Sequence, residues 1–149
     1  IGAELAALSA GDTTIGGVAS FTGLVRDMTP IEGADRSIST MTLEHYPGMT
    51  EKKLSEIEAE ANQRWPLAAS LIIHRYGRLA PGDQIVFVAC ASAHRQAAFD
   101  ACQFLMDWLK TDAPFWKLED TDAGEMWVET RATDDAAAAR WKQESGKTE

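Results

Sequence analysis

The chain has 149 residues, of which 45% are hydrophobic and 25% charged, which suits a single domain over residues 1–149 with a substantial core. Its formal net charge of -9 excludes general binding to nucleic acid or to an anionic membrane surface, because both need a cationic field. Any bound anion must therefore be held by a local basic cluster. No apolar run approaches the roughly 20 residues of a membrane span and no signal peptide is visible, which predicts a cytoplasmic protein.

The first half of the chain predicts, in order, a helix over 2–12, a strand over 16–27, a loop over 28–36, a strand over 37–46 and a helix over 49–65. Gly11 closes the first helix, and Gly23 marks a bulge or a close backbone approach within the first strand. The second strand alternates apolar and polar side chains, as a strand with one buried face does. The second helix has Thr50 as its expected N-cap and ends before Pro66.

The second half predicts strands over 69–79 and 83–92, a helix from Ser92 to 110–112, a hairpin of strands over 114–121 and 125–130, and a helix over 134–142. Ser92 is the expected cap of the long helix, and Pro114 ends it. Because helices separate pairs of strands, the pattern favours an α+β fold in two layers with a largely antiparallel sheet.

Two cysteines, Cys90 and Cys102, lie in apolar stretches. We expect both to be buried, reduced thiols, as in a cytosolic protein. No CxxC pair or Cys/His cluster with metal-ligand spacing is present, so we expect neither a metal nor a cofactor.

Basic residues follow or end several predicted elements, which is unusual in so acidic a chain. His94 and Arg95 lie in the first turn of the long helix, where exposed N–H groups attract anions; a surface arginine paired with a carboxylate explains them equally well. Lys110 in the last turn suits the helix dipole and needs no function for that. Lys117 lies beside aromatic residues in a strand, and partial desolvation lowers the pKa of such a lysine; a salt bridge is the alternative. Arg26 ends the first strand, and these residues together indicate an anion site with one or two poised lysines.

The order and spacing of several segments closely resemble the large, catalytic subunit of molybdopterin synthase, from about Ile15 to Trp141. The segments are FTGLVRD, LEHYPGMTEKKLSEI, NQRWPL, IIHRYGRLAPGDQIVFVACASAHRQAAFDACQFLMDWLKTDAPFWKLE and WVE. The resemblance implies an α/β hammerhead-type fold and a homodimer within a heterotetramer. It also implies a small ubiquitin-like sulfur-carrier subunit, whose C-terminal Gly-Gly thiocarboxylate enters a pocket of the large subunit. The implied substrate is the pterin phosphate precursor Z (cyclic pyranopterin monophosphate), which receives two sulfurs and becomes molybdopterin.

The resemblance also carries over site residues. It implies that Lys110 and Lys117 are catalytic and that the substrate contacts are Leu24, Val25, Arg26, His94, Arg95, Lys110, Lys117, Leu118 and Glu119. Many relatives carry a basic residue at the positions of Leu24, Asp112 and Leu118, so the site of this chain is expected to be less positive. We expect Lys110 to act as the main acid/base group facing the thiocarboxylate, with Lys117 assisting.

Two other classes of function fit parts of the pattern. A non-catalytic module that only docks a ubiquitin-like tail would bind the partner without using the lysines chemically. An enzyme for phosphorylated metabolites would turn over without a protein partner. The combination of SAHR and LKTDAPFWK argues against both, because a docking module needs no phosphate site.

Overall fold

The structure is a computed structural model that describes residues 1–26, 38–121, 124–128 and 132–144. Its helices are α1 (Gly2–Ser9), α2 (Met49–Arg64), α3 (Arg95–Thr111) and α4 (Ala132–Glu144). Its strands are β1 (Gly17–Leu24), β2 (Ile38–His45), β3 (Leu67–His74), β4 (Gly77–Leu79), β5 (Gln84–Ser92), β6 (Phe115–Thr121) and β7 (Gly124–Val128). The predicted loop over 28–36 lies outside the described residues. None of the helices in these ranges is both long and apolar enough to cross a membrane.

Three strands form an antiparallel sheet in the order β1-β5-β3. The central strand β5 is buried from Val86 to Ser92, as expected for a strand covered on both faces. The register between β1 and β5 shifts at Gly23 and Leu24. A Cβ atom on Gly23 would lie 2.6 Å from Cγ1 of Val86, so the close approach predicted for this glycine is confirmed.

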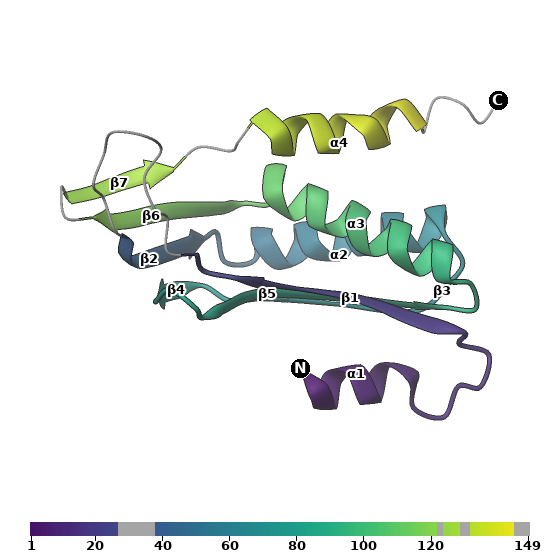
Figure 1. The fold of residues 1–149 in the computed structure, drawn as a ribbon. Coiled ribbons are helices and arrows are strands. Elements are labelled where there is room, and N and C mark those ends of the chain that lie inside the picture. The colour runs from purple at the N-terminus through teal and green to yellow at the C-terminus, as the bar shows by residue number, and fades with distance from the viewer. Residues whose placement is uncertain (27–37, 122–123, 129–131, 145–149) are drawn as a thin grey trace.

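Helices cover both faces of the three-stranded sheet. Helices α2 and α3 pack on one face and α1 on the other (Figure 1). The apolar side chains Val88 and Cys90 of β5 meet Ala98, Ala101 and Leu105 of α3 in the main core. Apolar residues that recur about every 3.6 positions along α3 pack against alternate residues of β5. The burial of these side chains holds α3 in place.

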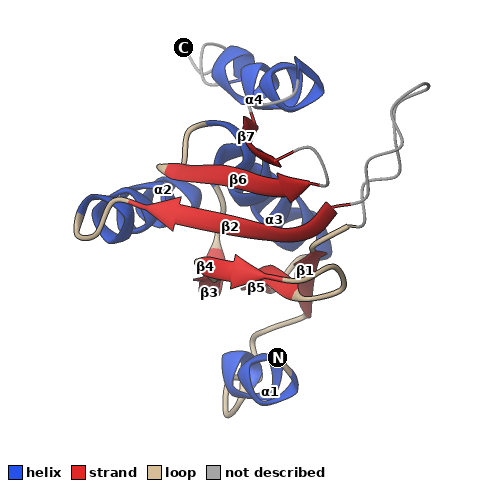
Figure 2. Cartoon of the chain, turned by 90° about the vertical axis from the view of Figure 1, so that its left-hand side faces the viewer, coloured by secondary structure: helices blue, strands red, loops and turns tan. Residues whose placement is uncertain are grey.

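Four strands form a second antiparallel sheet in the order β4-β2-β6-β7. Figure 2 shows β2 and β6 side by side, with β7 beyond β6. Met41, Leu43 and Leu79 of this sheet form a smaller core with Val25, and Phe115 packs against both cores. The α+β class with antiparallel sheets is therefore confirmed.

The predicted strand over 69–79 is wrong as a single element. The structure divides it into β3 and β4, which belong to different sheets. Gly77 has φ of 85°, a left-handed conformation that suits glycine because it lacks Cβ. The chain thus leaves one sheet and joins the other within a few residues.

Both predicted helix caps are also wrong. The N-cap of α2 is Gly48, whose N–H donates to the Glu51 carboxylate at 2.6 Å, while the Thr50 hydroxyl donates to the Tyr46 carbonyl. The N-cap of α3 is His94. Ser92 ends β5 instead, and its hydroxyl is buried and donates to the Pro66 carbonyl at 2.8 Å.

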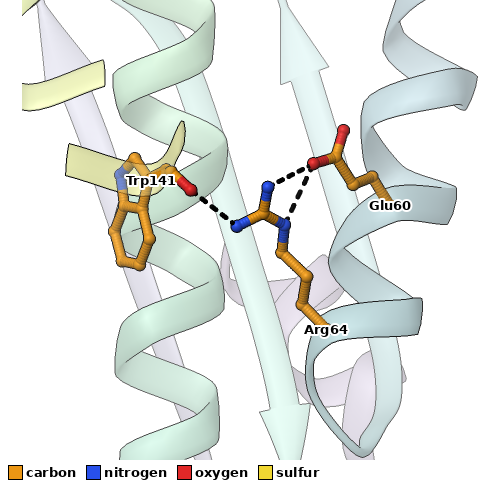
Figure 3. Close-up of polar contacts among 3 residues, drawn as sticks. All are labelled: Glu60, Arg64 and Trp141. Atoms are coloured by element: carbon orange, nitrogen blue, oxygen red, sulfur yellow. Dashed lines mark hydrogen bonds and ion pairs between the residues drawn. The ribbon is translucent and has the colours of Figure 1, made fainter. Parts of the chain in front are cut away.

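Trp141 attaches helix α4 to α2 and α3, and Arg140 adds an ion pair with Asp107 of α3. Trp141 is 7% exposed, and its ring packs edge-on against the rings of Trp65 and Phe104. Its indole N–H donates to the Asp107 carboxylate at 2.7 Å. Its carbonyl accepts from Arg64, whose guanidinium also pairs with Glu60 (Figure 3).

Candidate functional site

The two lysines predicted to be catalytic lie at the same end of the molecule. Lys110 is exposed in the last turn of α3. Three residues separate the end of that helix from β6, which carries Lys117. Lys117 pairs with Leu43 of β2 and with Val128 of β7, so two strands fix its backbone.

His74 lies near enough to both lysines to be affected by their charges. Its ring stacks on the ring of Phe115, with centroids 3.8 Å apart and planes 17° apart. Burial, as the largest cause, and the nearby groups of Lys117, Lys110 and His45 together lower the pKa of His74 from 6.5 to about 4, against an opposing hydrogen bond to the Arg75 carbonyl. Both lysine ammonium groups are therefore within electrostatic range of one neutral imidazole.

Aromatic rings extend this group of side chains outward. His45, the last residue of β2, lies 6.3 Å from Phe115 and 4.3 Å from Tyr76, measured between ring centroids. Tyr76 is 65% exposed. The ring surfaces can hold a flat ligand next to the lysines, because offset aromatic rings attract each other at these separations.

The end of β1 reaches the same region. Val25 is 5% exposed and belongs to the smaller core against which Phe115 packs. Hydrogen bonds from the Val25 N–H to Asp83 and from the Gly82 N–H to the Val25 carbonyl fix this turn. Leu24 is 54% exposed and Arg26 is exposed. Leu24, Val25 and Arg26 thus share the lysine end of the molecule.

His94 and Arg95 lie at the opposite end of α3. Both are exposed, and the His94 N–H donates to the Ser92 hydroxyl at 3.3 Å. Arg95 and Lys110 are the first and the sixteenth residues of the helix, so their Cα atoms lie about 22 Å apart at 1.5 Å per residue. A single copy of the chain does not bring them together.

The last two predicted contacts lie on β6 beyond Lys117. Leu118 pairs with Thr42 and Trp127, and alternation along the strand directs its side chain to the face opposite that of Lys117. The backbone of Glu119 pairs with Met41 and Met126. Leu118 could therefore contact a substrate in the pocket of Lys117 only through its backbone atoms.

Sequence reasoning missed His74. A lone histidine in a strand carries no signal of its own. The pattern of apolar residues in β3 does not show which strand of the other sheet lies against the end of β3. No group of three or more His, Cys, Asp or Glu side chains that could hold a metal occurs among the described residues.

The fold and this group of residues define an α+β protein with two lysines, a neutral histidine and aromatic rings at one end of its long helix. The MoaE protein family model matches residues 2–112, so the chain belongs to the MoaE family. It is 61% identical over 142 residues to the molybdopterin synthase catalytic subunit of Pseudomonas aeruginosa, covering 95% of this chain and 92% of that protein.

Solved structures agree with this assignment. The molybdopterin biosynthesis MoaE protein from Burkholderia ambifaria is similar with a TM-score of 0.78 and 55% identity, covering 95% of this chain and 90% of that one. A complex of subunits 1 and 2 of molybdopterin-converting factor from Helicobacter pylori shares the fold, with a TM-score of 0.67 at 16% identity, and covers 87% and 82%.

Proposed function

We propose that this chain is the catalytic subunit of a molybdopterin synthase. It transfers two sulfurs, one after the other, from the thiocarboxylated C terminus of a small sulfur-carrier subunit to precursor Z and so forms the dithiolene of molybdopterin. The observation that carries the proposal is the placement of Lys110 and Lys117 together at the end of α3, in a member of the MoaE family.

Each lysine has a distinct proposed role. The thiocarboxylate sulfur attacks a carbon of the pterin substrate, and water then cleaves the acyl–sulfur bond, which leaves the sulfur on the pterin and frees the carrier as a carboxylate. The oxygen that leaves the attacked carbon needs a proton. Lys110 gives that proton and faces the incoming thiocarboxylate. Because Lys110 is exposed in the chain by itself, its desolvation comes from the bound carrier tail and substrate. Lys117, fixed between two strands, holds the substrate or the acyl-linked intermediate.

The cations of the substrate site come from two copies of the chain. Arg26 lies at the lysine end, whereas His94 and Arg95 lie about 22 Å away along α3. In a homodimer, the His94 and Arg95 end of one copy can complete the lysine end of the other and bind the substrate phosphate through charge-assisted hydrogen bonds. Two such pockets, each with a carrier subunit, make the heterotetramer.

The buried thiols fit this scheme as non-participants in a reducing cytoplasm. Burial raises the pKa of Cys90 to about 12 and that of Cys102 to about 11, so neither is a thiolate nucleophile near neutral pH. The transferred sulfur arrives on the carrier subunit, as the proposal requires.

The test combines this chain, its thiocarboxylated carrier and precursor Z, and measures molybdopterin formation. Native protein should give product, Lys110→Ala almost none, and Lys52→Ala as much as native. Lys52 is the matched control because it is an exposed lysine on α2. Equal product from native protein and Lys110→Ala would move the acid/base role to Lys117. Carrier binding without product from native protein would favour the docking module instead.

A further inference from the structure

The tautomer of His74 is fixed by its surroundings. Its Nδ1 lies 2.8 Å from the Arg75 carbonyl oxygen. A carbonyl only accepts hydrogen bonds, so Nδ1 carries the hydrogen. In a neutral imidazole the other nitrogen, Nε2, then has a free lone pair and acts as an acceptor. The stack on Phe115 fixes the plane of the ring.

The acceptor Nε2 is accessible. It has no hydrogen-bond partner among the described residues, in which His74 bonds only through Nδ1. No side-chain nitrogen or oxygen in these residues is both buried and without a partner. Although most of the ring is covered, Nε2 therefore reaches solvent at the lysine end of the molecule.

The basic side chains at the lysine end supply no hydrogen-bond acceptor. Arg26, Lys110 and Lys117 only donate hydrogen bonds, which suits a phosphate or a thiocarboxylate. A pterin ring also presents N–H groups, and these need acceptors. The positive charges that act on His74 are those of Lys110 on α3 and Lys117 on β6, and the titratable ring of His45 on β2 acts in the same direction. They oppose protonation of the ring, so that Nε2 stays an acceptor at neutral pH.

We propose that His74 is a specificity-determining residue, whose Nε2 accepts a hydrogen bond from an N–H group of the pterin substrate. The inference rests on the proposed function and adds a hydrogen bond that recognises the pterin ring rather than the phosphate. His74 thereby favours pterins over other phosphorylated metabolites of similar charge, because a ligand that covers Nε2 without donating to it leaves that acceptor unpaired.

Binding of precursor Z without the carrier subunit tests the contact apart from the reaction. His74→Phe keeps a ring on Phe115 but has no acceptor, and His74→Gln keeps an acceptor near the position of Nε2. Loss of one hydrogen bond should weaken binding by about threefold to tenfold in His74→Phe, with a smaller change in His74→Gln. Ile73→Thr is the matched control, because Ile73 precedes His74 on the opposite face of β3 and is 40% exposed. It should bind like native protein.

In the full synthase assay, His74→Phe should raise KM for precursor Z by the same factor, with kcat and carrier affinity within about twofold of native. Equal binding of precursor Z by native protein and by His74→Phe would overturn the inference. Binding without product formation by native protein would overturn the proposed sulfur transfer alone, and an absence of binding by native protein would overturn both.

A measurement without any substitution guards against a variant that does not fold. The ¹⁵N chemical shift of His74 Nε2 in native protein should move upfield when precursor Z is added, because the lone pair becomes engaged. Inorganic phosphate alone should leave it in place. An Nε2 shift that precursor Z does not change would overturn the contact.

Discussion

The imidazole of His74 and the ring of Phe115 lie face to face, 3.8 Å apart between centroids, and they join the end of one sheet to the start of the strand that carries Lys117. This stack keeps a titratable ring in a place where its charged form is disfavoured. The consequence appears in the stability of the protein as a function of pH.

We expect the free energy of unfolding to fall as the pH drops from 6.5 toward 4. The pKa of His74 is about 4 in the folded chain, against an ordinary value of 6.5, so the unfolded state binds the proton first. The stability is complete above pH 6.5 and is lost through this window, by up to about 3 kcal/mol. Urea unfolding at several pH values measures it. His74→Gln should flatten the dependence between pH 6.5 and 4, and an unchanged slope would contradict the assignment.

Trp141 should be the main anchor of α4. Trp141→Ala removes the ring that packs on Trp65 and Phe104 and the donor to Asp107, and should cost about 3–5 kcal/mol. Asp107→Asn keeps an acceptor for the indole but loses the charge that also pairs with Arg140, so it should cost about 1 kcal/mol. Thermal unfolding of both variants makes the comparison. Similar losses would show that the charge of Asp107, rather than the aromatic packing, holds the helix.

Two adjacent glycines offer a sharp contrast near the start of α3. A Cβ on Gly16 would overlap the carbonyl oxygen of Ala93, whereas a Cβ on Gly17 meets nothing within 4 Å. Gly16→Ala should therefore destabilise the chain by about 1–3 kcal/mol and displace the turn before His94. Gly17→Ala should change stability by less than about 0.5 kcal/mol. The unfolding midpoints in urea test this, and equal midpoints for the two variants would contradict it.

Mixed dimers test whether two copies complete one pocket. Lys110→Ala and Arg95→Ala homodimers should each be inactive. After they are unfolded together and refolded, half of the dimers should be mixed, and each mixed dimer should contain one intact pocket and one doubly defective pocket. Product formation should therefore recover to about a quarter of the native rate if Lys110 and Arg95 act across the dimer. Refolding each variant by itself is the control. No recovery in the mixture would show that Lys110 and Arg95 do not complete one pocket across the dimer.

Hydrophobic periodicity predicted the helices and the core face of β2 because burial there is regular. It did not predict β4, since the switch between sheets depends on one left-handed glycine, Gly77, inside a continuous β-prone run. The cap of α2 was missed because Gly48 supplies only a backbone N–H and Glu51 supplies the acceptor. Of the site, Lys110 and Lys117 stood out by their positions in the sequence, and their catalytic roles came from the resemblance. His74 could not be predicted, because its position depends on how the two sheets meet.

The separation of Arg95 from Lys110 along α3 has a consequence for how this chain tolerates changes in its length. Deleting one residue inside α3 would shorten the spacing by about 1.5 Å and turn Lys110 by about 100° about the helix axis relative to Arg95. Both pockets of the proposed dimer would then be misaligned at once, even if every functional side chain were kept. Insertions and deletions are thus expected to be excluded from residues 95–111 more strictly than most single substitutions on the exposed face of that helix.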